Sequence, residues 1–163
     1  MKIQIVDRQD NLIGAKERTE VNRDKDIFRT AALWLRNGRG EVLLAKRSLS
    51  KDKDPGMWGP AVAGTVDEGE TYDTTIYREA EEEIGLHGVQ FELGPKVFYD
   101  YARPQWVQWY FAVVDRPIEK FTKQDDEVDE LMWTDEKSLL GDVENNQAKY
   151  VPSMPRTVQE LCL

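Results

Sequence analysis

Short apolar runs separated by clusters of turn-forming residues dominate the first third of the chain. Such runs predict strands, whose side chains alternate between the two faces of a sheet. Residues 3–6 and 12–13 flank Gln9-Asp10-Asn11, a pattern that predicts a small hairpin. The polar, mixed-charge residues 15–26 that follow are predicted to form a surface loop.

A second hairpin is predicted just downstream. Residues 28–35 and 42–47 are two apolar runs, and the Asn-Gly pair at 37–38 between them is a strong signal for a tight turn. Residues 48–60 contain Pro and Gly at several positions and are predicted to form a loop. We expect a short strand at residues 61–64.

The clearest predicted helix covers residues 71–84. Thr71 is a residue type that caps helix N-termini, Asp73 suits the first turn, and Gly85 is the residue type that ends helices. One arc of this helix is apolar and is predicted to face the core, through Ile76, Tyr77, Ala80 and Ile84.

Strands and helices mix irregularly in the second half of the chain. Further strands are expected at residues 89–93, 96–101, 106–114 and 130–133. Helices are expected at residues 135–140 and 155–161. Predominant strands with irregularly interspersed helices favour the α+β class, here an α/β/α sandwich around a mixed sheet.

The helix at 71–84 also has an acidic face. Glu79, Glu82 and Glu83 fall on one arc, because spacings of three and four residues bring helical side chains together. Arg78 is the only cation in this helix, so the repulsion among the glutamates is poorly balanced. Two interpretations remain open on this feature alone. One is a solvated acidic surface, and the other is a site for a hard divalent cation, Mg²⁺ or Mn²⁺, which prefers oxygen ligands.

The composition restricts the class of protein. With 163 residues, 40% hydrophobic and 33% charged, residues 1–163 are predicted to form a single folded domain. The net charge of −9 disfavours nucleic acid and anionic membranes as partners. No apolar run has the length of a membrane span or of a signal peptide. A lone cysteine, Cys162, excludes a disulfide framework and fits a cytoplasmic location.

The loop before the acidic helix favours the metal site. Residues 64–86 resemble the Nudix box, G-x5-E-x7-R-E-U-x-E-E-x-G-U with U apolar, at every defined position. The matching residues are Gly64, Glu70, Arg78, Glu79, Ala80, Glu82, Glu83, Gly85 and Leu86. The resemblance implies the Nudix fold, a divalent metal, and attack of water on a diphosphate that joins a nucleoside or other group to a second group.

The resemblance also implies a role for each matching residue. The implied metal ligands are Glu79, Glu82, Glu83 and the backbone carbonyl of Gly64. Glu70 and Arg78 occupy the positions that brace the loop against the helix, so we assign them structural support.

The reaction also needs a carboxylate that removes a proton from the attacking water. Glu79 is the first candidate, because a box glutamate serves as the base in many Nudix enzymes. Glu127, in the acidic run 125–130, is the second, because in other members the base lies on a later loop. The same run is equally well explained as an acidic surface loop.

Two cations precede the box and are candidates for binding the substrate diphosphate. Arg47 ends a predicted strand and Lys51 follows four residues later. This segment resembles the Nudix branch related to isopentenyl diphosphate isomerase. That isomerase uses a cysteine in the strand before the box and histidines as metal ligands. Residues 61–65 contain neither residue type, which disfavours isomerase chemistry.

An aromatic-rich stretch leaves core packing and nucleobase stacking both open. Its members are Trp58, Phe98, Tyr99, Tyr101, Trp106, Trp109 and Tyr110. The substrate is expected to be chosen by the loops near 15–26, 48–60 and 100–105.

Together these observations predict a hydrolase that uses Mg²⁺, with Mn²⁺ as the alternative ion, on a small-molecule diphosphate substrate. An isomerase-like enzyme and a non-catalytic, Nudix-like nucleotide-binding module are the alternatives. A homodimer formed through the N-terminal hairpin or exposed strands also remains open.

Overall fold

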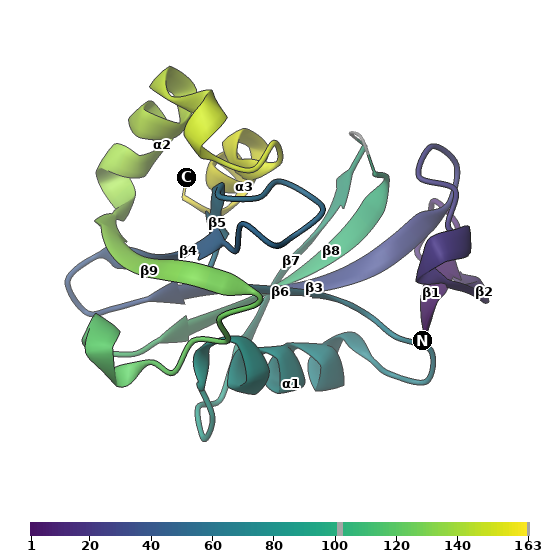
Figure 1. Ribbon diagram of the computed structural model, residues 1–163, viewed down its shortest axis with the longest axis horizontal. Helices are drawn as coiled ribbons and strands as arrows, with labels where there is room; N and C mark the ends of the chain where they lie inside the picture. The colour runs from purple at the N-terminus through teal and green to yellow at the C-terminus, as the bar shows by residue number, and fades with distance from the viewer. Residues whose placement is uncertain (101–102, 163) are drawn as a thin grey trace.

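The computed structural model describes residues 1–100 and 103–162 and shows a curled sheet between two helical layers (Figure 1). Helix α1 (Tyr72–Ile84) lies on one side of the sheet. Helices α2 (Glu136–Asn145) and α3 (Met154–Leu161) lie on the other. The predicted α+β class and its α/β/α layers are therefore confirmed.

The described residues form one sheet of nine strands, with parallel and antiparallel pairs. These are β1 (Lys2–Val6), β2 (Leu12–Glu17), β3 (Ile27–Arg36), β4 (Glu41–Arg47), β5 (Trp58–Pro60), β6 (Val62–Thr65), β7 (Glu92–Tyr99), β8 (Gln105–Val113) and β9 (Val128–Asp135). Single 3-10 turns occur at η1 (Arg18–Glu20), η2 (Ile118–Lys120) and η3 (Gln147–Lys149). The parallel pair β3–β8 connects the two halves of the chain.

The predicted hairpin of residues 28–35 and 42–47 is only partly correct. The turn forms, but β3 and β4 share one register pair, Arg36 with Val42. Beyond it the strands diverge. β3 pairs with β1, β6 and β8, while β4 pairs with β5 and β9. Because β3 and β4 have different partners beyond the turn, the sheet is curled (Figure 1).

Two local predictions are corrected by the structure. Residues 89–93 do not form a separate strand; their end belongs to β7, whose register against β8 shifts between Leu93 and Lys96. Pro95 lies in that shift and has no N–H to donate to the sheet. The predicted loop 15–26 begins with the end of β2 and η1. Tyr101, at the end of the predicted strand 96–101, lies outside the described residues.

Apolar side chains fill a core on each face of the sheet. The α1 side contains Leu33, Ile76 and Ile84, all fully buried. The α2–α3 side contains Trp34, whose ring meets Trp109 edge-on at 6.0 Å between centroids. The prediction that Tyr77 faces the core is wrong. Its side chain is 42% exposed, and its ring stacks on Phe91 at the rim.

The N-terminal hairpin is attached to the loop that precedes α1. β1 pairs with the start of β3, and the Gln4 N–H donates to the Val66 carbonyl at 3.1 Å. The buried Gln4 side chain donates to the carbonyls of Asp67 and Glu70, at 3.2 and 2.7 Å. It also accepts a bond from Arg29 Nη1 at 2.9 Å. The predicted hairpin is thus confirmed, and it supports the box loop.

Candidate metal and diphosphate site

Helix α1 begins and ends where its sequence predicts. The Thr71 hydroxyl accepts a bond from the Thr74 N–H at 3.1 Å, and the Thr74 hydroxyl accepts one from the Thr71 N–H at 3.0 Å. Gly85 adopts a left-handed φ of 67° and closes the helix with a bond from its N–H to the Glu81 carbonyl. These two ends fix the position of the acidic face between them.

The three box glutamates lie in different environments on that helix. Glu83 is 8% exposed and lies seven residues after the fully buried Ile76, so it borders the core. The Glu79 side chain is 16% exposed and that of Glu82 is 51% exposed. The acidic face thus runs from the edge of the core to solvent and is more than a solvated surface.

Gly64 brings the backbone of β6 against the Glu79 side chain. A Cβ at this position would lie 2.4 Å from the Glu79 Cγ and 2.5 Å from its Cδ, closer than any side chain tolerates. Residue 64 on β6 must therefore lack a side chain for the Glu79 carboxylate to lie beside the backbone. This contact places the backbone of one element beside a carboxylate of another.

Arg78 connects the box loop to the acidic face. Its Nε and Nη2 each donate to a different carboxylate oxygen of Glu70, at 3.0 Å. Its Nη1 donates to Glu79 at 3.0 Å and to Glu82 at 3.1 Å. The bond with Glu70 is the main cause that raises the pKa of Arg78 further above its ordinary value. This geometry supports the predicted bracing role of Glu70 and Arg78.

Glu83 has an unfavourable environment for a charged carboxylate. Burial is the main cause that raises its pKa well above the ordinary value, and the neighbouring charges of Glu79 and Glu127 raise it further. The charge of Lys51 acts in the opposite direction. A buried carboxylate crowded by like charges is stabilised by a cation, so this residue type and position suit a metal ligand.

Within residues 1–100 and 103–162, no three Asp, Glu, His or Cys side chains are grouped as ligands of one ion. Glu79 and Glu82 each point to Arg78 Nη1. The chemistry of the donors nevertheless fits a hard divalent cation, because the box supplies carboxylate and carbonyl oxygens and no sulfur or imidazole.

The second candidate base, Glu127, is held beside the box by the chain that follows α1. The Gln124 N–H donates to the Glu83 carbonyl at 2.8 Å, and the Ser48 N–H donates to the Glu127 carbonyl at 3.0 Å. The Glu127 carboxylate accepts a bond from Lys51 Nζ at 2.6 Å. The structure therefore brings Glu127 and Lys51 close to Glu83, and the role of Glu127 as a base stays a prediction.

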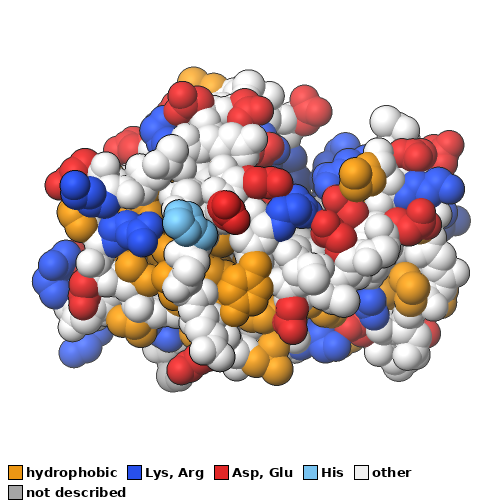
Figure 2. All heavy atoms as spheres, turned by 90° about the horizontal axis from the view of Figure 1, so that it is seen from below, with side chains coloured by type: hydrophobic (Ala, Val, Ile, Leu, Met, Phe, Trp, Pro, Cys, Tyr) orange, Lys and Arg blue, Asp and Glu red, His pale blue; other side chains and the backbone are white. Residues whose placement is uncertain are grey.

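Arg47 lies at the end of β4, as predicted, and its Nε donates to the Lys53 carbonyl at 2.8 Å. Its own backbone bonds to Met57 and Gly56 close the 48–57 loop on itself, at 2.9 Å each. Arg47 and Lys51 therefore belong to one ordered loop, and the carboxylates lie next to it. Figure 2, seen from the α1 side, shows Lys and Arg side chains in a hollow beside the lobe of the N-terminal strands, with Asp and Glu side chains along its edge.

Most of the aromatic stretch is core. Trp58, Tyr99, Trp109 and Tyr110 are buried. Phe98 and Trp106 are only half-buried, and their rings form a tilted pair with centroids 5.2 Å apart. Among the described residues this pair is the less buried part of the stretch, and the Arg8 guanidinium lies over the Phe98 ring, 5.5 Å from its centroid.

Two supporting residues were not predicted from the sequence. Gln4 holds the box loop through backbone carbonyls, and Asp10 accepts bonds from Arg29, Tyr72 and Lys96. The Asp10 side chain is 6% exposed and its backbone has a φ of 63°. The only sequence feature that points to Gln4 is that a polar residue occupies a position within an apolar strand. This feature does not predict which groups Gln4 contacts.

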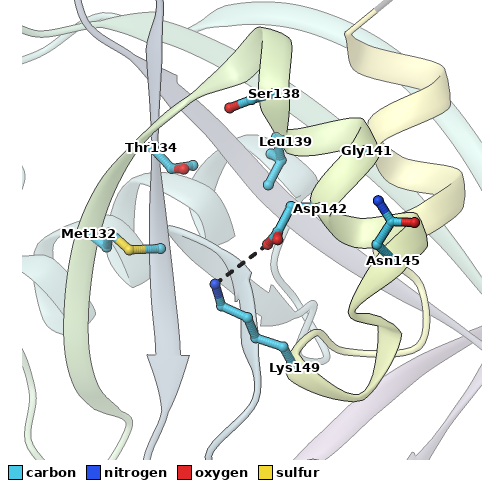
Figure 3. A pocket seen from close by; sticks show the side chains of 8 residues that line it. All are labelled: Met132, Thr134, Ser138, Leu139, Gly141, Asp142, Asn145 and Lys149. Atoms are coloured by element: carbon cyan, nitrogen blue, oxygen red, sulfur yellow. Dashed lines mark hydrogen bonds and ion pairs between the residues drawn. The ribbon is translucent and has the colours of Figure 1, made fainter.

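A second hollow, of about 550 Å³, lies on the opposite layer between β9 and α2 (Figure 3). Its two charged residues are paired with each other: Lys149 contacts Asp142 at 3.4 Å, and Asp142 also accepts a bond from Tyr150. None of the box residues lines it. The reactive groups therefore lie on the α1 side of the sheet.

No helix in the described ranges has both the length and the apolar character needed to cross a bilayer.

Comparison with known proteins places the chain in a family. The NUDIX domain family model matches residues 27–154. The chain is similar to an uncharacterised Nudix hydrolase of Yersinia pestis, with 33% identity over 132 residues that cover 80% of this chain and 71% of the relative. A second such protein, from Pseudomonas aeruginosa, is 31% identical over 159 residues, which cover 97% and 89%. An isopentenyl-diphosphate Delta-isomerase of Klebsiella pneumoniae is more distant, at 26% over 83% of this chain and 77% of the relative.

Solved structures agree on the fold. A protein from Deinococcus radiodurans superposes with a TM-score of 0.86 at 21% identity and covers 98% of both chains. The NUDIX domain of NrtR from Shewanella oneidensis, complexed with ADP ribose, superposes with a TM-score of 0.61 at 18% identity, covering 89% of this chain and 90% of that one. With the family match over most of its length and an intact box on α1, this chain belongs to the Nudix hydrolase family.

Proposed function

We propose that this Nudix hydrolase cleaves a diphosphate linkage in a nucleoside diphosphate joined to a second group, with Mg²⁺ or Mn²⁺ as cofactor. The observation that carries the proposal is the set of box glutamates on α1, in which Glu79 packs against the bare backbone of Gly64 and Glu83 lies near Glu127. The whole chain, residues 1–163, is proposed to act as one Nudix domain.

Glu79, Glu82, Glu83 and the Gly64 carbonyl are proposed to hold the metal. A bound divalent cation would neutralise the diphosphate charge, polarise phosphorus and lower the pKa of water. Glu82 is the most exposed of the three glutamates and contacts Arg78 at 3.1 Å, so it is free to exchange this partner. Arg78 would keep its two bonds to Glu70 and continue to hold the loop.

A carboxylate must accept the proton of the attacking water. Glu79 is our first choice, because it lies against Gly64 and next to the other ligands. Glu127 is the second choice, because its carboxylate lies near Glu83 and pairs with Lys51 at 2.6 Å. Replacing either residue by Gln and measuring the pH dependence of kcat distinguishes them, since the base variant loses the acidic limb of the profile.

Arg47 and Lys51 are proposed to bind the substrate diphosphate. Both lie on the loop that contacts Glu127, and both are only partly exposed. A nucleoside derivative as substrate is supported by the ADP ribose bound to the Shewanella domain. Cytoplasmic location and a homodimer built on the N-terminal strands stay part of the proposal.

The isomerase alternative finds no support at the site. Cys162 lies in the α3 layer, where its thiol donates to Glu136 at 3.2 Å, and His87 is an exposed residue beyond the end of α1. A non-catalytic module is disfavoured by the complete box.

The test compares Glu82→Gln with Glu81→Gln, an exposed glutamate on the same helix that is not part of the box pattern. Mg²⁺-dependent release of phosphate products from a panel of nucleoside diphosphate derivatives is measured for each. Glu82→Gln is expected to lose about a thousandfold in kcat, or about 4 kcal/mol of barrier, and Glu81→Gln is expected to keep the wild-type rate. A folded Glu82→Gln enzyme with an unchanged rate refutes the proposal.

A further inference from the structure

Asp67, in the loop between β6 and α1, has a carboxylate whose capacity to accept hydrogen bonds is largely unused. Its side chain is only 13% exposed. The Oδ1 atom is buried and accepts no hydrogen bond from the described residues, and the nearest cation, Arg18 Nη2, lies 3.5 Å away. The Oδ2 atom lies 3.7 Å from Arg78 Nη2, which is longer than a hydrogen bond. Buried carboxylates are normally paired, so this one is well placed to accept a further donor.

The backbone of Asp67 is held by the first strand. Its carbonyl accepts a bond from the Gln4 side chain at 3.2 Å, and the next residue, Glu68, donates its N–H to the Lys2 carbonyl at 2.9 Å. Asp67 also forms an antiparallel bridge with Ile3. The position of Asp67 is therefore fixed from β1, whereas its carboxylate has only two long ion pairs.

Arg78 divides its guanidinium between the box loop and the proposed metal ligands. Nε and Nη2 bind Glu70, whereas Nη1 donates to Glu79 at 3.0 Å and to Glu82 at 3.1 Å. A cation held by Glu79 and Glu82 would bring a second positive charge close to Nη1, and the two charges would repel each other. Metal binding therefore requires these two carboxylates to turn away from Arg78.

Asp67 is the carboxylate that is left for Arg78 after such a change. Within the described residues Arg78 forms ion pairs with Glu70, Glu79, Glu82 and Asp67. Asp67 is the one of these four that it does not yet bind through a hydrogen bond. Only a small shift is needed, because the present 3.7 Å would shorten to about 2.9 Å in a charge-assisted hydrogen bond.

We propose that Asp67 is a positioning residue, which receives the Arg78 guanidinium when Glu79 and Glu82 turn to the metal. Arg78 keeps its two bonds to Glu70 throughout, so the box loop stays attached to α1. The gain in the Asp67–Arg78 pair offsets the loss of the two Nη1 bonds and so favours metal binding. This inference rests on the proposed function for its metal ligands, and it adds a residue that is not a defined position of the box.

Calorimetric titration with Mn²⁺, without substrate, measures this contribution. Asp67→Asn keeps the shape of the side chain and is expected to weaken Mn²⁺ binding about fivefold, because Arg78 then competes longer for Glu79 and Glu82. Glu68→Gln, an exposed carboxylate on the same loop, is the matched control and should change the Kd by less than about twofold. In EDTA, Asp67→Asn should unfold within about 3 °C of the wild type, because its ion pairs in the metal-free protein are long.

Two further measurements test whether Asp67 acts through Arg78. In a double-mutant cycle, Asp67→Asn is expected to change Mn²⁺ affinity by less than about twofold when Arg78→Gln is already present, because no guanidinium is left to receive. Crystals of the wild type soaked in Mn²⁺ need no variant. In them the distance between Asp67 Oδ2 and Arg78 Nη2 is expected to shorten from 3.7 Å to about 2.9 Å.

The outcomes separate this inference from the proposed function. A wild type that binds no Mn²⁺ overturns the proposed metal site, and the inference with it. Equal Mn²⁺ affinity of the wild type and Asp67→Asn overturns the role of Asp67 and leaves the metal site in place. The same holds for a loss that persists in full beside Arg78→Gln, and for Mn²⁺-bound crystals in which the distance stays at 3.7 Å.

Discussion

Gly64 contributes to the site because it has no side chain. The distance of 2.4 Å between an added Cβ and the Glu79 Cγ means that any larger residue must displace either the β6 backbone or the carboxylate. Asp10 contributes in the opposite way, since its buried carboxylate collects bonds from three side chains of separate elements. Both residues show that individual atoms set the geometry of the box loop.

We expect Gly64→Ala to lower kcat/KM by about a hundredfold, because a displacement of about 1 Å at a reacting group has that effect. The loss of stability should be about 1–3 kcal/mol, as for other overpacked sites. Gly14→Ala on β2, where a Cβ meets nothing within 4 Å, is the control for both measurements. A fully active Gly64→Ala enzyme would contradict the close approach of β6 and Glu79.

Asp10→Asn keeps a residue type that tolerates the φ of 63° but removes the charge. Burial alone would raise the pKa of Asp10, but bonds from Lys96, Arg29 and Tyr72 outweigh it, so the pKa is lowered. A lowered pKa stabilises the folded state above the ordinary value near 3.8, and this contribution is lost as the pH falls through the lowered pKa. Denaturant unfolding should show the variant less stable by about 3 kcal/mol at pH 7, with the gap narrowing below pH 4. A gap of equal size at both pH values would contradict this account.

At the scale of elements, β1 and α1 hold the box loop between them. Gln4 on β1 donates to two carbonyls of that loop, and Arg78 on α1 binds Glu70 with two bonds. The carbonyls at the end of α1 accept bonds from Thr122 and Gln124, which sets the position of the following segment. Three parts of the chain therefore hold the box through hydrogen bonds: β1, α1 and the segment that follows α1.

Gln4→Leu should destabilise the protein by about 2 kcal/mol, because two carbonyls and Arg29 lose a buried partner. Amide exchange of residues 66–70 is expected to accelerate more than that of α1, since the loop loses its support first. Gln159→Leu, an exposed position on α3, is the matched control. Unchanged exchange in residues 66–70 would show that β1 does not hold the loop.

The elements with strong local signals were predicted well. Helix α1 begins at its Thr71 cap and ends at Gly85, because both ends are determined by residues within one turn of them. The pairing of β3 with β8, and the separation of β3 from β4, depend on residues far apart in sequence, and no local pattern encodes them. The box residues could be identified from the sequence, because the spacing that defines them lies within one helix and the loop before it. The supporting roles of Gln4 and Asp10 could not, because their partners lie on elements far away in the sequence.

At the scale of the whole molecule, a chain of net charge −9 is proposed to bind an anionic diphosphate substrate. We propose that positive charge is supplied locally, by a cation among the box glutamates and by Arg47 and Lys51. Many of the other carboxylates lie on the exposed surface, where they oppose non-specific association with nucleic acid.

Glu83 connects stability to pH and metal. Its pKa is raised, chiefly by burial, so the stability of the metal-free protein should fall as the pH rises from the ordinary value near 4.5 through the raised pKa. Glu83→Gln should unfold a few degrees higher than the wild type at pH 8 in EDTA, with the difference disappearing near pH 4. In Mg²⁺ the order should reverse, because only the wild type gains stability by binding the ion. A wild type more stable than Glu83→Gln in EDTA at pH 8 would contradict this interpretation.

The most direct test of the central claim is anomalous diffraction from crystals soaked in Mn²⁺. We predict one or more peaks among the carboxylates of Glu79, Glu82 and Glu83 and the Gly64 carbonyl, with metal–oxygen distances of about 2.1 Å. Glu82 should then have left Arg78, from which it lies 3.1 Å away in the present structure. Soaked crystals with no peak at this position, and with Glu82 still bound to Arg78, would contradict the account.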